Sequence, residues 1–246
     1  MTPAESRGKH PGAERRMFSA TLFDYNGVLV DDEAVHLAAF RDALSSLGVE
    51  VSQARYFEEY IGYDDAAAFV AILRDTGRSA PPELVSELVR AKGPMYLARA
   101  RADLPVFEGA AALVARSAAR GPVGVVSGAL RDEIELGLRV LGVSAHVGYV
   151  VSAEDAPRSK PDPQGYLLAL DWLSSLSAAD AASDVVVIED SLAGVEAAKR
   201  AGLRCIAVAH SYPKQRLESS RADVVVERLT DIDDALLERL HASLDA

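Results

Sequence analysis

"LFDYNGVLVDDE" at residues 22–33 decides the fold of this chain, because an apolar run ends there in one aspartate, Asp24. A strand that delivers a carboxylate into a loop is typical of the carboxyl edge of an α/β sheet, where ligands bind. Asn26 follows two residues later, where a second carboxylate would be the obvious partner. The stretch raises two questions: what Asp24 does, and why an amide accompanies it.

The composition indicates an ordinary globular protein. Of 246 residues, 49% are hydrophobic and 26% are charged, which suits one large domain or one domain carrying a smaller one. No apolar run approaches the ~20 residues that span a bilayer, and residues 1–16, which we expect to form a polar disordered tail, lack the apolar core of a secretory signal. The single cysteine, Cys205, lies in an apolar run, which suggests a buried structural thiol and a reducing cytoplasm.

The net charge of −11 limits the partners that we expect. Nucleic acids and anionic membranes require a basic surface, so neither is an expected partner. A small phosphorylated metabolite stays possible, because a few local cations can dominate one pocket. The sequence leaves a monomer and a small homo-oligomer equally open.

Short apolar runs rich in β-branched residues predict six strands, at residues 19–23, 123–127, 147–152, 185–189, 204–208 and 224–226. Helical periodicity separates most of them, as at residues 132–141, 164–176 and 192–201. Strands that alternate with helices indicate βαβ units. The predicted fold class is therefore α/β, with a Rossmann-like, mainly parallel sheet core and helices on both faces.

One long interval breaks this alternation. Between the first two strands lie only amphipathic stretches, at residues 34–48, 54–62, 64–77 and 81–100. We interpret residues 34–104 as an inserted all-α cap domain, and residues 17–33 and 105–246 as the core. The alternative is a larger α/β domain with several helices in a row.

Polar groups follow four of the predicted strands. In chain order they are Asp24, Ser127, Lys160, and the pair Glu189 and Asp190. Several acids in one crevice repel one another unless a cation lies between them, and oxygen ligands suit Mg²⁺. Each group alone has an ordinary explanation, such as a helix cap or a solvated lysine, so only the ordered set is specific.

In this order the motifs resemble those of the haloacid dehalogenase superfamily of aspartate-nucleophile hydrolases. Within it, the chain is most similar to the beta-phosphoglucomutase-like group, which has a helical cap. The resemblance runs from residue 19 to the C-terminus and rests on four motifs: "FDYNGVLVDDE", "VVSG", "KPDPQGY" and "IEDSLAGVEAAKRAG".

The resemblance implies a role for each strand-end group. Asp24 would attack phosphorus to form an aspartyl-phosphate, which water then hydrolyses. Mg²⁺ would be held by Asp24, the backbone carbonyl of Asn26, Asp190, and Glu189 as a direct ligand or an outer partner. The phosphoryl oxygens would be bound by Ser127, the backbone of Gly128, and Lys160. These implied roles make Asp24, Asn26, Ser127 and Lys160 the candidate catalytic residues.

Further candidates for substrate binding are Arg131, Lys92 and His36. Arg131 is either a phosphate ligand or a solvated arginine at a helix start. Lys92 and Tyr96 share a helical face; Lys92 either reaches the site, as in related caps, or is a surface lysine beside a buried tyrosine. His36 stands at the hinge into the cap, as a ligand or a packing residue.

One cap loop departs from its relatives. Tyr63, Asp64 and Asp65 occupy a place that often carries an arginine in related caps. The missing cation weakens the case for a substrate with a second phosphate.

Asn26 is the main departure in the core. The resemblance implies that phosphatases carry a second aspartate here, which protonates the leaving oxygen and then activates water. An amide donates a hydrogen bond but shuttles no proton, and such acid–base help is worth ~10²–10⁴-fold.

Four accounts of Asn26 stay open. Water or another residue, such as Asp31, Asp32 or Glu33, supplies the acid of a slow phosphatase. The leaving group needs no proton, as in an acyl phosphate or a phosphonate. The protein is a catalytically weak ligand-binding or regulatory pseudoenzyme. Finally, deamidation at the Asn26–Gly27 bond restores an aspartate. The sequence predicts a Mg²⁺-dependent phosphatase-like hydrolase of small phosphorylated metabolites, with the pseudoenzyme as the alternative.

Overall fold

The computed structural model describes residues 17–61, 63–177 and 182–243. Within these ranges six strands form one parallel sheet in the order β3-β2-β1-β4-β5-β6. The strands are β1 (Ala20–Phe23), β2 (Val123–Val126), β3 (Tyr149–Val151), β4 (Val185–Glu189), β5 (Arg204–Val208) and β6 (Val224–Val226). The predicted parallel α/β fold is confirmed, and the last three strands keep their predicted bounds. The predicted tail at residues 1–16 lies outside the described residues.

Alternate residues of each strand pack on opposite faces of the sheet, as the twofold period of a strand requires. Phe23 belongs to one hydrophobic cluster and Leu22 to the other. The first face is covered by α5 (Ala110–Ala118), α6 (Arg131–Val140) and α10 (Asp234–Ala242). The second is covered by α7 (Gln164–Ser175), α8 (Leu192–Arg200) and α9 (Lys214–Glu218). The predicted helices correspond to α6, α7 and α8; the other three are additional.

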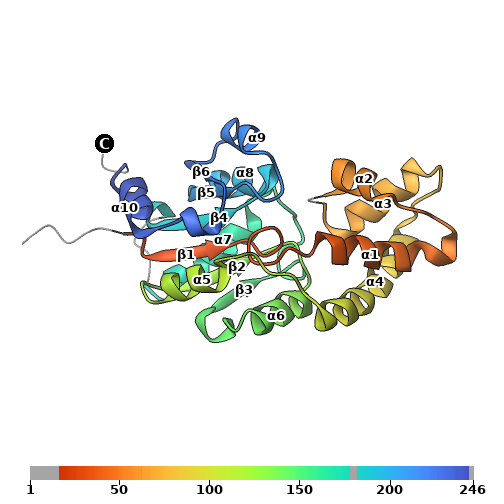
Figure 1. The fold of residues 1–246 in the computed structure, drawn as a ribbon, viewed down its shortest axis with the longest axis horizontal. Coiled ribbons are helices and arrows are strands. Elements are labelled where there is room, and N and C mark those ends of the chain that lie inside the picture. Colours follow the sequence, from red (N-terminus) through yellow and green to blue (C-terminus); the bar gives the residue numbers. More distant parts are fainter. Residues whose placement is uncertain (1–16, 62, 178–181, 244–246) are drawn as a thin grey trace, which may run out of the picture.

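Between β1 and β2 the chain forms what we call the helical block, residues 33–102. It contains α1 (Glu33–Leu44), α2 (Gln53–Arg55), the π-helical turn η2 (Tyr56–Tyr60), α3 (Asp65–Asp75) and α4 (Pro82–Ala102). It has its own hydrophobic cluster, in which Leu44, Phe69 and Ile72 are fully or almost fully buried. Figure 1 shows this block beyond the carboxyl end of β1. The π-helical turn replaces the regular helix predicted at residues 54–62.

Short 3-10 turns complete the described secondary structure: η1 (Ser45–Leu47), η3 (Ser144–His146), η4 (Ala182–Asp184) and η5 (Leu229–Asp231). Cys205 is fully buried in the sheet, in line with its prediction as a structural thiol. Among the described helices, none combines the length and the apolar character that a bilayer crossing requires.

The loop after β1 is tightly folded and positions the site. The Asp24 N–H donates to the Ile188 carbonyl of the neighbouring strand at 2.9 Å, and the Gly27 N–H donates to the Val30 carbonyl at 2.9 Å. Gly27 has a φ of 74°, which glycine adopts without strain. A Cβ atom at Gly27 would lie 1.9 Å from Oδ2 of Asp190, so only glycine lets the loop approach that carboxylate.

Candidate active site

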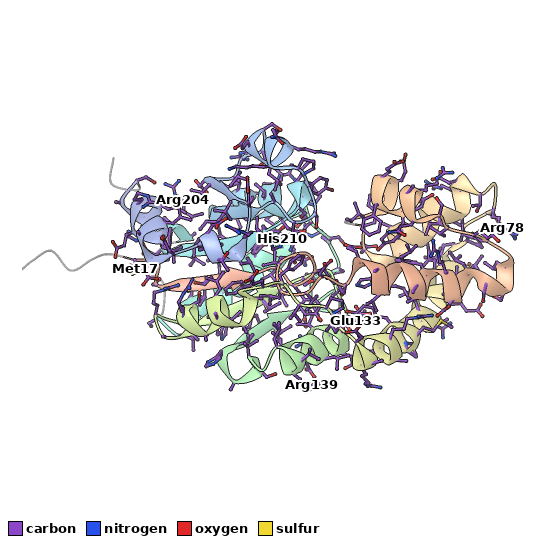
Figure 2. The ribbon with its side chains drawn as sticks, in the orientation of Figure 1. Met17, Arg78, Glu133, Arg139, Arg204 and His210 are labelled. Carbon is purple, nitrogen blue, oxygen red and sulfur yellow. The ribbon has the colours of Figure 1, made fainter. Side chains whose placement is uncertain are left out.

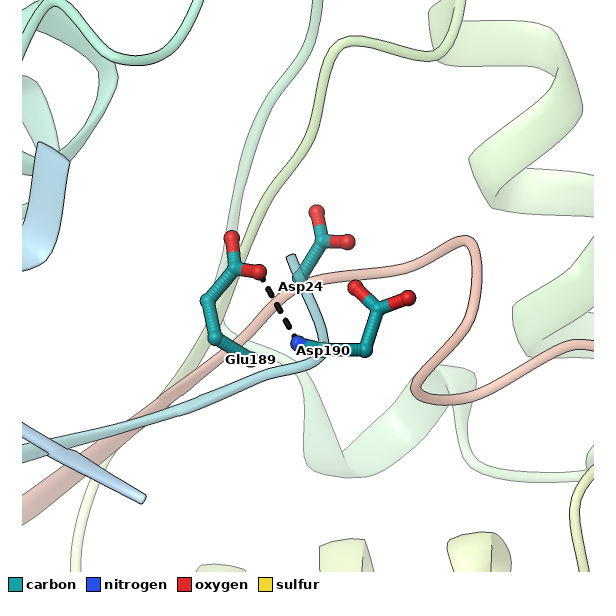
Figure 3. Close-up of side chains that lie close together, drawn as sticks. All are labelled: Asp24, Glu189 and Asp190. Atoms are coloured by element: carbon teal, nitrogen blue, oxygen red, sulfur yellow. Dashed lines mark hydrogen bonds between the residues drawn. The ribbon is translucent and has the colours of Figure 1, made fainter. Parts of the chain in front are cut away.

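Three carboxylates meet where β1 and β4 end. The two strands pair in parallel, with Phe23 opposite Ile188, so Asp24 emerges beside Glu189 and Asp190. One oxygen of each carboxylate lies within 4.8 Å of the others, and all three residues are buried. In Figure 3 the three side chains gather in one place, and the Asp190 N–H donates to Glu189 Oε2 at 2.9 Å. Sequence reasoning correctly expected these groups to converge.

The electrostatics of this cluster fit a divalent cation. Burial raises the pKa of Asp24 to about 7, although Lys160 opposes the shift. Burial, assisted by the charges of Glu189 and Asp24, also raises the pKa of Asp190. A cation between such carboxylates stabilises their charged forms. An all-oxygen set with few carboxylates is the donor chemistry that Mg²⁺ prefers, so the residues present suit that ion.

Lys160 contacts two of the three carboxylates. Its Nζ donates to Asp24 Oδ1 at 2.7 Å, to Glu189 Oε1 at 2.7 Å and to the Val126 carbonyl at 3.0 Å. The charges of Asp24 and Glu189 outweigh the cost of burial and raise the pKa of Lys160. Lys160 therefore stays protonated and partly neutralises the acids, whose charge would otherwise repel an anionic ligand.

Ser127 lies at the end of β2, facing the same cavity. Its hydroxyl accepts a hydrogen bond from the Ala129 N–H at 3.1 Å and donates to Oδ1 of Asn26 at 3.3 Å. Gly128 also lines the cavity, and an added Cβ atom there would have no neighbour within 4 Å. The backbone after β2 is therefore open to a ligand.

Asn26 is held by a buried carboxylate. Its Nδ2 donates to Asp32 at 2.8 and 3.1 Å and lies 3.2 Å from Nε2 of His36. Asp32 is fully buried and also accepts from Tyr96 at 2.5 Å. Although burial alone would raise it, the pKa of Asp32 is lowered by His36 and by hydrogen bonds from His36, Tyr96 and Asn26. Of the three acids considered as substitutes, Asp32 is the one that contacts Asn26.

The contacts of Asn26 oppose the deamidation account. Deamidation requires the Gly27 nitrogen to attack the side-chain amide of Asn26. That nitrogen donates its hydrogen to Val30, and the amide is held by Asp32 and Ser127. Both reacting groups are therefore fixed in other interactions.

Lys92 does not line the cavity itself but supports residues that do. It is completely buried, and its Nζ contacts Nδ1 of His36 at 2.8 Å and Oδ1 of Asp65 at 2.5 Å. His36 and Asp65 both line the cavity. The His36 ring stacks on Tyr96, with 4.5 Å between ring centroids. Lys92 is therefore neither the free surface lysine nor the direct ligand that the sequence suggested.

Arg131 does not line the cavity. Its guanidinium donates to Asp155 at 2.5 Å and to the Val150 carbonyl at 3.1 Å. Asp155, in the loop after β3, also accepts the Ser152 hydroxyl and N–H, and so it is fixed in place for Arg131. Arg131 therefore ties α6 to that loop and lies outside the cavity lining.

The cavity has a volume of about 520 Å³ and lies between the sheet edge and the helical block. A direct contact joins its two sides: the Ser159 hydroxyl donates to Oδ2 of Asp64 at 2.6 Å. Sequence reasoning missed several lining residues, namely Glu133, Ser211 and Tyr212. Ser211, which hydrogen-bonds to Asp190, follows β5 by a few residues, so the strand-end rule could have found it. Glu133 carried no such signal.

Comparison with known proteins agrees with this arrangement. Residues 21–208 match the family model described as "Haloacid dehalogenase-like hydrolase". Validoxylamine A 7'-phosphate phosphatase of Streptomyces hygroscopicus subsp. limoneus is 30% identical over 230 residues, covering 88% of this chain and 96% of that protein. It is named as a phosphatase, in agreement with the predicted enzyme class.

Two solved structures share the fold. CbbY from Rhodobacter sphaeroides, solved in complex with phosphate, superposes with a TM-score of 0.78 at 26% identity, covering 90% of this chain and all of that one. Beta-phosphoglucomutase from Clostridium difficile gives 0.79 at 18% identity, covering 93% and 99%. The predicted resemblance is confirmed: this chain belongs to the haloacid dehalogenase-like hydrolases.

Proposed function

We propose that this chain is a Mg²⁺-dependent phosphatase-like hydrolase that acts on small phosphorylated metabolites. The observation that carries the proposal is the convergence of Asp24, Lys160, Ser127 and the Glu189–Asp190 pair at one end of one cavity. The comparisons support it, because the family is one of hydrolases and a relative is named as a phosphatase.

In the proposed reaction the Asp24 carboxylate attacks phosphorus, and the bond from phosphorus to the ester oxygen breaks. The resulting aspartyl-phosphate then takes up water at phosphorus, which releases inorganic phosphate and restores Asp24. Lys160 and the Ser127 hydroxyl hold phosphoryl oxygens and stabilise the charge that develops on them. Mg²⁺, held by Asp24, Asn26 and Asp190 with Glu189 beside them, would supply positive charge between the nucleophile and the phosphate.

We propose that the helical block is the cap of this enzyme. It forms the wall opposite Lys160, and its Asp64 contacts Ser159 of the core. Closure around a substrate displaces bulk water, which strengthens the electrostatic interactions at the phosphoryl group. In this scheme His36 connects the helical block to Asn26 of the core. Lys92 holds Asp65 in place within the helical block.

Asn26 limits the first step, because the departing oxygen needs a proton that an amide does not provide. An ester with a strongly basic alkoxide is therefore a slow substrate, and one with an acidic leaving group is a fast one. The same observation favours a second candidate function, in which the chain binds a phosphorylated ligand and turns it over weakly or not at all.

The test measures phosphate release from p-nitrophenyl phosphate and a panel of sugar phosphates, with and without Mg²⁺. We expect Mg²⁺-dependent turnover that Asp24→Ala lowers by more than about 10³-fold. Asp171→Ala is the matched control, because Asp171 is an exposed acid of α7 that does not line the cavity. Turnover that survives Asp24→Ala would contradict the proposed nucleophile. Absence of turnover together with a raised melting temperature in the presence of sugar phosphates would favour the binding function.

A further inference from the structure

The wall of the cavity carries many more acids than bases. Of the described residues that line it, Lys160 is the one lysine or arginine, and it is committed to Asp24 and Glu189. The acids that line it are Asp24, Glu33, Asp64, Asp65, Glu133 and Asp190. Asp24 and Asp190 belong to the phosphate end. Glu33, Asp64, Asp65 and Glu133 line the rest of the cavity.

Glu133 is an acid with an unused oxygen. It lies in the first turn of α6 and is only 2% exposed. Oε2 accepts a weak hydrogen bond from the Leu130 N–H at 3.3 Å, whereas Oε1 is buried and has no hydrogen-bond partner among the described residues. Figure 2 shows Glu133 where α6 approaches the helical block. Burial raises the pKa of Glu133, although the charges of His36 and Lys92 oppose the shift.

Asp65 has an unused oxygen as well. Its Oδ1 accepts Lys92, but its Oδ2 is buried and has no partner among the described residues. Lys92 and His36 contact each other and are the two basic side chains whose charges act on both Glu133 and Glu33. Glu33, on the same side, accepts a single hydrogen bond from the Tyr56 hydroxyl at 2.7 Å. The positive charges nearby are therefore too few for the acids.

We propose that the leaving group of the substrate carries a protonated amine, and that Glu133 and Asp65 bind it. This proposal rests on the proposed phosphatase function, since it assigns the phosphate to the Lys160 end of the same cavity. An ammonium group brings a charge and up to three N–H donors. It would satisfy both unused oxygens, and buried carboxylate oxygens without a donor are costly.

The same wall argues against other substrates. A second phosphate or a carboxylate on the leaving group would face Glu33, Asp64, Asp65 and Glu133, and like charges at short range repel strongly in a buried site. A neutral polyol donates hydrogen bonds but leaves the excess negative charge uncompensated. The substrate class is thus an amino alcohol or amino sugar phosphate monoester.

The test compares matched pairs of substrates that differ only by an amine in place of a hydroxyl. One pair is glucosamine 6-phosphate and glucose 6-phosphate; the other is phosphoethanolamine and 2-hydroxyethyl phosphate. We expect kcat/KM to be about tenfold higher for the amine in at least one pair, the factor that one charge-assisted hydrogen bond provides. Glu133→Gln, which keeps size and the acceptor for Leu130, should reduce that ratio to about one. Glu135→Gln, at an exposed position of the same helix, should leave it unchanged.

Melting temperature with each compound gives a second reading that does not need turnover. An amine that stabilises wild-type protein more than its hydroxyl partner, but loses this advantage in Glu133→Gln, supports the proposal. Equal kcat/KM and equal stabilisation within both pairs would overturn it while leaving the phosphatase function intact. If no monoester is hydrolysed or bound at all, the proposed function itself is wrong and the amine site is rejected with it.

Discussion

The two ends of the cavity are held together by different kinds of interaction. At the phosphate end, Lys160 bridges Asp24 and Glu189, and every group lies at the carboxyl end of a strand or in the loop that follows one. At the leaving-group end, side chains from α1, α3, α4 and α6 meet, and two buried oxygens stay unpaired. At the first end, Lys160 neutralises part of the acidic charge and leaves room for a divalent cation. At the second end, Lys92 and His36 face a larger number of acids, and an oxygen of Glu133 and one of Asp65 have no hydrogen-bond partner among the described residues.

Asn26 stands at the boundary between these ends. Its Oδ1 faces Ser127 of the phosphate end, and its Nδ2 faces Asp32 and His36 on the other side. The carboxylate that the family resemblance led us to expect at position 26 is therefore replaced by an amide, while a buried carboxylate lies one hydrogen bond away. The comparison predicts that changes at the phosphate end abolish chemistry, and that changes at the other end alter substrate preference.

The largest effect is expected from Lys160→Met. Removing the cation leaves Asp24 and Glu189 facing each other without compensation and removes a contact to the phosphoryl group. We expect kcat/KM for p-nitrophenyl phosphate to fall by about 10²–10³-fold. Lys214→Met is the control, because Lys214 is a partly exposed lysine outside the cavity lining and its ion pair with Glu227 is long, at 3.9 Å. A loss below about threefold would show that the phosphate end does not depend on this bridge.

A smaller effect is expected from Asn26→Asp, and it should depend on the leaving group. With glucose 6-phosphate, whose leaving group needs a proton, a general acid gives up to about 10²-fold in kcat. With p-nitrophenyl phosphate, which needs none, the gain should be below about threefold. Equal gains for both substrates would contradict a missing acid as the cause.

Asp32 makes this substitution unfavourable unless it is compensated. An aspartate at position 26 would face Asp32 across the 2.8 and 3.1 Å now spanned by the Asn26 amide. Two carboxylates at that distance do not both ionise readily. The exchange Asn26→Asp with Asp32→Asn keeps one acid and one amide, so its melting temperature should exceed that of the single variant. A higher kcat for glucose 6-phosphate in the double variant than in Asn26→Asp alone would confirm that positions 26 and 32 act as a pair.

The phosphate end could be predicted from the sequence because its geometry follows from topology. Asp24, Ser127 and Glu189 end neighbouring parallel strands, so the sheet itself brings them to one edge. Glu133 could not be predicted as a cavity residue, since a glutamate in the first turn of a helix is an ordinary feature of helix starts.

The partners of Lys92 and Arg131 were equally hidden. Lys92 meets Asp65 because α3 and α4 pack together. In the sequence, Asp65 was interpreted as part of a loop that lacks the arginine of related caps, and not as the partner of a buried lysine. Arg131 was expected either as a phosphate ligand or as a solvated arginine, but it is ion-paired with Asp155. Helical periodicity predicts which face of a helix is buried, but it does not predict which charges meet between two helices.

The smallest effect is expected from the contact between Ser159 and Asp64, which joins the core to the helical block. The Ser159 hydroxyl donates to Oδ2 of Asp64 at 2.6 Å, while Oδ1 of Asp64 accepts the Ala67 N–H and caps α3. Ser159→Ala should raise KM for a sugar phosphate by about two- to fivefold, the value of one exposed hydrogen bond. Ser219→Ala is the control, because it removes an exposed hydroxyl that donates to the carbonyl of Arg216, three residues earlier in the chain.

Asp64→Asn separates closure from direct substrate contact, because it keeps an oxygen to cap α3 but weakens the bond to Ser159. If the two residues act through their mutual contact, the double variant should raise KM no more than either single variant does. Additive increases in KM would mean that Ser159 and Asp64 each contact the substrate separately. In that case the helical block is held over the phosphate end by the ligand itself, and the unpaired oxygens of Glu133 and Asp65 become the main contacts that close it.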